Sequence, residues 1–212
     1  MKPHKNSPEF LQAISVERMR ESDAYTIENF VNSKTLMYRA AQGICDSLKR
    51  EWTKTAIVCG SGNNGGDGYA LACILADRGC DVHIYRVSDK FSEDGRHYCL
   101  EAEKRNVKIY EFTSDVDFAI YDIVVDCMLG TGFEGTPRGN VASAIEKINS
   151  SGAYVISADI NSGLNGNTGD AVIAVKSDLT VSIGFYKKGM FIGDAPDYIG
   201  DLVNVDIGIK LI

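Results

Sequence analysis

Short apolar runs are the feature that most constrains the fold of this chain. The clearest is TAIVC at residues 55–59, a continuous run that stops at a glycine. Runs of this kind are typical of strands that are buried on both faces, as in parallel sheets. They alternate with segments in which apolar residues recur at helical spacing. The predicted strands are 55–59, 82–87, 107–112, 123–127, 154–158, 179–183 and 202–206, and the predicted helices are 16–32, 36–48, 68–78, 93–105 and 141–150.

This alternation predicts an α/β fold, a three-layer, Rossmann-like, doubly wound and mainly parallel sheet preceded by two N-terminal helices. Crossovers between parallel strands are right-handed and place helices on both faces of the sheet. A chain of 212 residues is long enough for one such core. We therefore expect a single domain over residues 1–212, with a flexible N-terminal tail over residues 1–14.

Composition and charge exclude several classes of partner. The formal net charge is -7, which opposes binding to nucleic-acid phosphates. No apolar run approaches the length of a membrane span, and the first residues lack the apolar centre of a secretory signal. We therefore expect a cytoplasmic protein without nucleic-acid or membrane partners. The six cysteines show no metal-binding spacing, so we expect buried, reduced thiols.

Unusual residues follow three of the predicted strands. The segments are GSGNNGGDG at 60–68, DCMLGTGFEGTPRG at 126–139 and ADINSGLNGNTGD at 158–170. Ligands of doubly wound sheets bind beyond the carboxyl ends of the strands, where the strand order reverses. In a 3-2-1-4-5 order the three strands are neighbours. We expect their loops to form one continuous rim around a pocket.

The first loop indicates a nucleotide-like ligand. Its glycine spacing matches GxGxxG, and it lies between a predicted strand and a predicted helix. Asp67 would repel a pyrophosphate at that helix N-terminus. The amides of Asn63 and Asn64 suit a ribose, an amide or a hard cation better. The alternative is that the glycines only form a tight turn.

The second and third loops together suggest a cation site. Asp126 ends an apolar strand, so its carboxylate needs a compensating partner. With an asparagine of the first loop and Ser162 of the third, it offers carboxylate, amide and hydroxyl oxygens, which hard cations prefer. The alternative is that Asp126 only accepts hydrogen bonds from loop amides.

Phosphate binding and catalysis are suggested by two further features. The segment GTGFEG at 130–135 can bring backbone N–H groups close to a phosphate, and Arg138 follows closely. Asp159 comes directly after the apolar run VISA, and burial raises the pKa of a carboxyl toward values useful for acid–base catalysis. The alternative for Asp159 is a turn or helix-capping role.

Taken together, the three loops resemble those of the NAD(P)H-hydrate epimerase family, also called the YjeF-type amino-terminal domain. The similarity begins with ERMRESDAYTIE and LMYRAAQ and continues through NNGGDG, DCMLGTG, DINSG, SDLTVSIGFYKKG and YIGDLVNVDIGI. The resemblance implies an isomerase that interconverts the R and S forms of hydrated NADH and NADPH, which carry a hydroxyl on carbon 6 of the nicotinamide ring. The hydrate is then a substrate, and a separate ADP- or ATP-dependent NAD(P)H-hydrate dehydratase consumes one epimer.

The resemblance also implies roles for individual residues. Asp159 would act at the reacting ring, with Lys187 as a weaker candidate for electrostatic support. One potassium ion (K+) per subunit would bind to Asn64, Asp126 and Ser162, and the resemblance favours a homodimer. The substrate would contact Asn63, Asn64, Gly65, Gly66, Asp67, Gly130, Thr131, Gly132, Phe133, Glu134, Gly135, Thr136 and Asp159.

Two positions depart from the family pattern. Asn161 stands where the family's DIPSG has a proline, and Lys188 stands where its PKPG has one. The loss of a proline gives a loop more conformational freedom. We therefore expect looser loop geometry with an unchanged reaction class.

Two other functions are compatible with the sequence. Arg86, at the end of the second predicted strand, could bind the 2′-phosphate of NADP in an oxidoreductase, although Asp67 counts against that function. The second alternative is a non-catalytic nucleotide-binding or protein-interaction module of the same fold. Such a module would be free to lose Asp126, Asp159 or Ser162.

Overall fold

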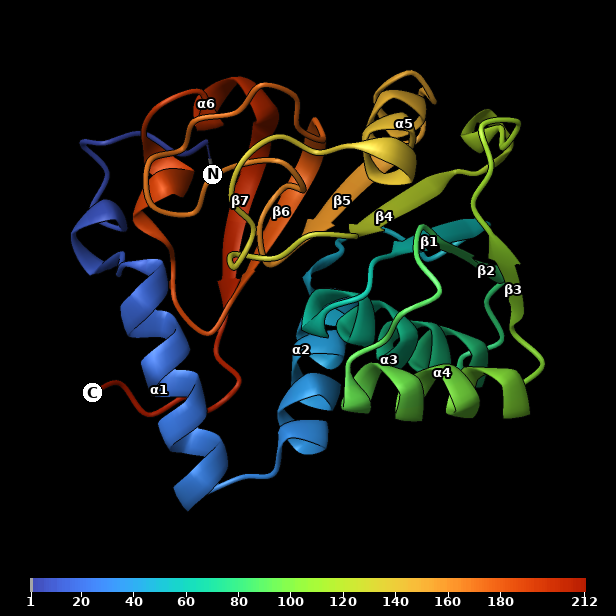
Figure 1. Cartoon of the computed structure of the whole chain (residues 1–212), viewed down its shortest axis with the longest axis horizontal. Helices are drawn as coiled ribbons and strands as arrows, with labels where there is room; N and C mark the ends of the chain where they lie inside the picture. The colour runs from blue at the N-terminus through green and yellow to red at the C-terminus, as the bar shows by residue number, and fades with distance from the viewer. Residues whose placement is uncertain (1) are drawn as a thin grey trace.

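In residues 2–212, which the computed structural model describes, seven parallel strands form one central sheet (Figure 1). The strand order is β3-β2-β1-β4-β5-β6-β7, so the direction of winding reverses between β1 and β4. This confirms the predicted doubly wound sheet and its 3-2-1-4-5 core. The strands are β1 (Thr55–Cys59), β2 (Val82–Arg86), β3 (Lys108–Glu111), β4 (Ile123–Cys127), β5 (Tyr154–Ala158), β6 (Ser177–Ile183) and β7 (Ile199–Val205).

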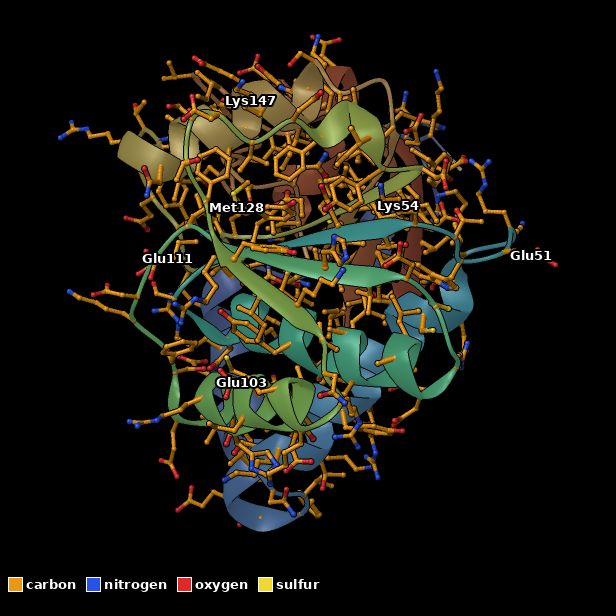
Figure 2. The ribbon with its side chains drawn as sticks, turned by 90° about the vertical axis from the view of Figure 1, so that its right-hand side faces the viewer. Glu51, Lys54, Glu103, Glu111, Met128 and Lys147 are labelled. Carbon is orange, nitrogen blue, oxygen red and sulfur yellow. The ribbon has the colours of Figure 1, made fainter. Side chains whose placement is uncertain are left out.

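Helices cover both faces of the sheet. Figure 2 shows the two outer layers, with Lys147 of α5 on one side of the strands and Glu103 of α4 on the other. Helices α2 and α3 lie on the same face as α4 (Figure 1). The helices are α1 (Val16–Asn29), α2 (Ser33–Ser47), α3 (Asn63–Asp77), α4 (Glu93–Lys104), α5 (Gly139–Asn149) and α6 (Ala195–Tyr198), with short 3-10 turns η1 (Phe10–Gln12), η2 (Phe118–Ile120) and η3 (Lys188–Phe191).

Side chains of the central strands alternate between two apolar cores, because successive residues of a strand point to opposite faces. In β1, Ile57 and Cys59 belong to the core under α2, α3 and α4, whereas Ala56 and Val58 belong to the core under α5. Every residue of β1 and of β4 is buried. Burial on both faces is the reason why these strands appear in the sequence as continuous apolar runs.

The largest difference from the predicted elements is at the start of α3. The sequence predicted a loop over 60–68 and a helix from residue 68, but α3 begins at Asn63 with Gly62 as its N-cap. Most of NNGGDG is therefore helical, although glycine is a poor helix former. Close packing explains the exception, since a Cβ atom on Gly65 would lie 2.1 Å from the carbonyl oxygen of Gly60.

The end of the N-terminal segment packs against the domain. The Ile14 N–H donates to the Tyr186 carbonyl oxygen (2.9 Å), and the rings of Phe10 and Phe191 pack edge to face at 5.8 Å. The sequence predicted a flexible tail over 1–14, and these contacts place residues 10–14 in the domain instead. Within residues 2–212, no helix is both long and apolar enough to cross a membrane.

The six cysteines are free thiols in the structure. Five are buried and Cys80 is half-buried, so the prediction of buried, reduced thiols holds for five of them. Burial raises the pKa of Cys45 and of Cys73 to about 11, which keeps both thiols protonated and unreactive near neutral pH.

We predict that Gly60→Ala destabilises the fold, because its Cβ atom would lie 1.9 Å from the carbonyl oxygen of Met128. Relief of that overlap requires movement of the β1 or β4 backbone, and overpacking of this kind costs about 1–3 kcal/mol. The matched control is Gly62→Ala, two residues away, where a Cβ atom has no neighbour within 4 Å. Urea unfolding measures both variants. Equal losses in the two variants would contradict the packing explanation.

Candidate functional site

One cavity of about 520 Å³ opens at the carboxyl ends of the central strands, where the strand order reverses. Its wall combines α1 and α2 with the start of α3, the loop after β4 and the first residue after β5. Figure 2 shows the direction of the strands, because Met128 follows β4 and Glu111 ends β3 at one edge, while Lys54 precedes β1 at the other. The predicted pocket therefore exists at the predicted edge of the sheet.

The first loop contributes part of its predicted residues to the wall. Asn63, Asn64 and Asp67 line the cavity from the first turns of α3. Gly65 and Gly66 do not, because they pack inward against the Gly60 backbone and the Met37 side chain. These two glycines allow close packing of α3 and do not form part of the cavity surface.

The loop after β4 divides in the same way. Residues 130–133 line the cavity, whereas Glu134, Gly135 and Thr136 lie outside its wall. Arg138, expected near a phosphate, is also outside the wall and is the exposed N-cap of α5. Four of the six residues of the GTGFEG segment therefore lie in the cavity wall.

The carboxylate of Asp126 is fully buried and holds the loops after β4 and β5 together. It accepts hydrogen bonds from Ser162 N (2.8 Å), Ser162 Oγ (2.5 Å), Ser157 Oγ (3.0 Å) and Met128 N (3.2 Å). Burial raises the pKa of Asp126, and these hydrogen bonds act in the opposite direction. The alternative interpretation, in which Asp126 accepts hydrogen bonds from loop amides, therefore describes real contacts.

Asn64 completes the set of oxygens that the sequence assigned to a cation. Its Nδ2 donates to the carbonyl oxygen of Leu129 (2.9 Å), whose own N–H donates to Ser162 Oγ (2.8 Å). The other amide atom, Asn64 Oδ1, is buried and has no hydrogen-bond donor. A buried oxygen without a donor is costly, and a bound cation would satisfy it. The oxygen atoms of Asn64, Asp126 and Ser162 thus fit the ligands that a hard cation prefers.

Asp159 lies at the end of β5 in a backbone conformation that is unusual for a residue other than glycine, with φ at +65°. It forms an ion pair with Lys187, whose side chain is fully buried. The Lys187 ammonium also donates to the Ile183 carbonyl oxygen (3.0 Å) and to Ser182 Oγ (3.4 Å). The second carboxylate oxygen of Asp159 accepts from Thr131 N (3.3 Å). The structure thus brings both predicted catalytic residues together.

The cavity wall is acidic. Among the described residues, its charged side chains are four carboxyls, on Asp23, Asp67, Asp94 and Asp159, and the guanidinium of Arg20. Burial raises the pKa of Asp67 well above its ordinary value, and the neighbouring carboxylates of Asp159 and Asp23 raise it further. Asp67 is therefore protonated over a range where exposed aspartates are ionised.

Sequence reasoning missed the contribution of the N-terminal helices. Met19, Arg20, Asp23 and Ile27 of α1 line the cavity, together with Ser33, Leu36, Met37 and Ala40 of α2. The sequence predicted amphipathic helices in these segments and did not assign them to the pocket. Arg20 and Asp23 are the available signal, because charged residues on an apolar helix face need a polar environment.

Asn161 corrects the expectation of a looser third loop. Its side chain is fully buried, and Nδ2 donates to the Val175 carbonyl oxygen (2.9 Å), Ser177 Oγ (2.9 Å) and the Tyr198 carbonyl oxygen (3.1 Å). Its Oδ1 accepts from Thr180 Oγ1 (2.6 Å). Hydrogen bonds thus fix the loop where the family has a proline. Lys188, at the other departure, is exposed at the start of η3.

Arg86 is engaged outside the cavity. Its guanidinium pairs with Glu111 on the neighbouring strand (3.1 Å) and lies over the ring of Phe91. The residue that favoured an NADP-dependent oxidoreductase therefore already has a carboxylate partner and lies outside the cavity wall.

We predict that Asp159→Asn lowers the free energy of unfolding by about 3 kcal/mol, because it leaves the buried Lys187 ammonium without a counter-ion. Asparagine is the appropriate replacement since it tolerates positive φ. The double variant Asp159→Asn with Lys187→Met should recover most of the loss. Urea unfolding at pH 7 measures this. A double variant less stable than Asp159→Asn would contradict the explanation.

Comparisons with known proteins agree with this site. The model of the family described as YjeF-related protein N-terminus matches residues 33–189. An NAD(P)H-hydrate epimerase of Lentilactobacillus buchneri is 36% identical over 206 residues, which cover 93% of this chain and 95% of the relative. One from Limosilactobacillus reuteri is 32% identical over 199 residues, which cover 90% of this chain and 92% of the relative.

Two further similarities concern a longer relative and the fold. A bifunctional NAD(P)H-hydrate repair enzyme of Coxiella burnetii is 30% identical over 91% of this chain and 41% of the relative. The crystal structure of yeast YNL200c superimposes with a TM-score of 0.73 at 16% identity, over 91% of this chain and 86% of that one, which shows the shared fold. This chain belongs to the YjeF-related protein N-terminus family.

Proposed function

We propose that this protein is an NAD(P)H-hydrate epimerase, an isomerase that interconverts the R and S forms of hydrated NADH and NADPH. The observation that carries the proposal is the carboxylate of Asp159, which the buried Lys187 fixes in the wall of a cavity of about 520 Å³. Asn63, Asn64 and Asp67 line the same cavity. The curated relatives that match nearly the whole chain bear this name.

The reaction needs proton transfer and no redox step. Once the hydroxyl on carbon 6 is protonated, it leaves as water with the electron pair of the carbon–oxygen bond. The lone pair of the ring nitrogen stabilises the flat iminium that results. Water then adds to either face and gives up a proton. Asp159 suits such proton transfer, because Lys187 and the Thr131 N–H fix its carboxylate in the cavity wall.

The cavity offers distinct surfaces to the parts of a dinucleotide. Met19, Ile27, Leu36 and Met37 form an apolar wall that suits a flat ring. The phosphates need positive charge in an otherwise acidic cavity. Arg20 supplies it, and its Nη2 lies 3.6 Å from the position of a Cβ atom on Gly132. We therefore assign Arg20 to the phosphate role that the sequence gave to Arg138.

We also propose one potassium ion per subunit, held by Asn64, Asp126 and Ser162. The support is the buried Asn64 Oδ1, which has no donor. Asn64 Nδ2 and Ser162 Oγ both donate to the Leu129 carbonyl oxygen, and Ser162 Oγ also donates to the Asp126 carboxylate. Bound there, the ion would supply positive charge close to the anionic substrate. Asp126 already accepts four hydrogen bonds, so Asn64 brings the oxygen that most needs a partner.

The proposed activity requires a second enzyme, because epimerisation alone does not regenerate the cofactor. We propose a separate ADP- or ATP-dependent dehydratase as the functional partner. A homodimer and a cytoplasmic location stay predictions.

A coupled assay tests the proposed function. R-hydrate is supplied with an S-specific dehydratase and ATP or ADP, and the rate of cofactor recovery is followed by absorbance. We expect this protein to raise the rate in proportion to its concentration. The matched control is the double variant Asp159→Asn with Lys187→Met, which should fold and remain at the background rate. No acceleration by the wild type, or equal acceleration by the control, would contradict the proposal.

We predict that potassium stabilises the protein. At a free concentration of about 100 times Kd, a bound ion adds about 2.7 kcal/mol to the free energy of unfolding. Thermal unfolding in KCl is compared with choline chloride at equal ionic strength. Asn64→Ala should remove the difference, whereas Asn63→Ala, at the exposed neighbouring position, should retain it. A potassium effect of the same size in Asn64→Ala would refute the assignment.

A further inference from the structure

We propose that Asp23 of α1 is a second catalytic acid–base residue, which exchanges a proton with the substrate on the ring face opposite to Asp159. This inference rests on the proposed epimerase function and extends it, because it assigns the two faces of the reaction to two side chains. Asp23 was not among the residues that the sequence comparison indicated.

The geometry brings the two carboxyls into one cavity from different elements. Asp159 reaches the cavity from the end of β5, and Asp23 reaches it from α1. Helix α1 lies where β6 ends, since a Cβ atom on Gly184 would lie 2.8 Å from the terminal methyl group of Met19. Met19 and Ile27 flank Asp23 by one turn on each side and line the same cavity. Asp23 is thus a half-buried carboxyl within an apolar helix face.

The chemistry of epimerisation requires groups on both faces of the ring. When the hydroxyl leaves from one face, a group on that face must give it a proton. When water adds to the other face, a group there must take one. A single carboxylate could serve both only if the ring turned over inside the cavity. Two carboxyls that share one proton remove that requirement.

The proton balance closes over one turnover. Protonated Asp23 gives its proton to the leaving hydroxyl, and water departs with the electron pair of the carbon–oxygen bond. Asp159 then takes a proton from the incoming water as the new carbon–oxygen bond forms. Asp23 is left ionised and Asp159 protonated, which is the state that converts the opposite epimer. No oxidant or reductant is needed.

The charges around Asp23 agree with a shared proton. They are Asp159 at the end of β5, Lys187 after β6, Asp67 on α3 and Arg20 one turn earlier on α1. Burial raises the pKa of Asp23, the Asp159 carboxylate raises it further, and the Lys187 ammonium lowers it. Burial and the Asp159 carboxylate thus favour the protonated form of Asp23, which is the form that can give a proton to a leaving hydroxyl, and Lys187 contacts Asp159 directly.

Asp23→Asn tests the inference in the coupled assay, with saturating dehydratase. General acid–base catalysis contributes a factor of about 10² to 10⁴. We therefore expect kcat to fall at least about 100-fold with KM within about threefold. The alkaline limb of the pH profile of kcat, where Asp23 loses its proton, should disappear while the acidic limb remains. The matched control is Glu21→Gln, an exposed carboxyl of the same helix, which should leave kcat and both limbs unchanged.

The outcomes separate this inference from the proposed function. If the wild type does not accelerate recovery of the cofactor, the epimerase proposal itself fails. If the wild type is active and a folded Asp23→Asn keeps its kcat within about threefold, or keeps both limbs, only the role of Asp23 is overturned. If Asp23→Asn does not fold, Asp23→Glu decides, because moving the carboxyl should shift the alkaline limb. An unshifted limb would overturn the inference.

Discussion

The rest of the site depends on the hydrogen bonds that the buried carboxylate of Asp126 accepts. A charged group that leaves water costs several kcal/mol unless hydrogen bonds replace its hydration. Here Ser157, Ser162 and Met128 provide those hydrogen bonds from β5 and from the loops after β4 and β5. Satisfying one carboxylate therefore positions both loops, and with them Leu129 and the start of the GTGFEG segment.

The ion pair of Asp159 and Lys187 depends on that arrangement. The loop that Ser162 anchors begins at Asp159, whose positive φ is a strained conformation that the surrounding contacts must impose. Lys187 is fully buried, so its ammonium needs the Asp159 carboxylate at this position. The same pair that stabilises the loop directs a carboxylate into the cavity. Stability and proposed catalysis thus share one interaction.

The acidic cavity has the opposite effect on stability. Asp23 and Asp67 are pushed toward their protonated forms by burial and by the Asp159 carboxylate. A raised pKa in the folded protein means that folding loses stability as pH rises from the ordinary pKa of these carboxyls through their raised pKa in the folded protein. Such a cost is common where a site must hold protons for a reaction. Asn161 shows the contrasting case, since its hydrogen bonds stabilise a loop without any titratable group.

The sequence by itself determined the order of strands and helices and the edge of the sheet that carries the site. It also indicated that the loops after three strands meet at that edge. These follow from local patterns, because burial on both faces produces continuous apolar runs and parallel strands end at one edge. The resemblance further indicated Asp126, Asp159 and Ser162. Local pattern failed at NNGGDG, where close packing against the Gly60 backbone overrides the low helix propensity of glycine.

Only the tertiary structure decided which side chains share the cavity. Arg20 and Asp23 look in sequence like interruptions of an amphipathic helix, and nothing local indicates that α1 lies against the end of β6. Gly65 and Gly66 look like ligand contacts, but packing places them against other protein atoms. The physical reason is the same in both cases. Periodicity defines the face of a helix, whereas the contacts of that face depend on how distant segments pack together.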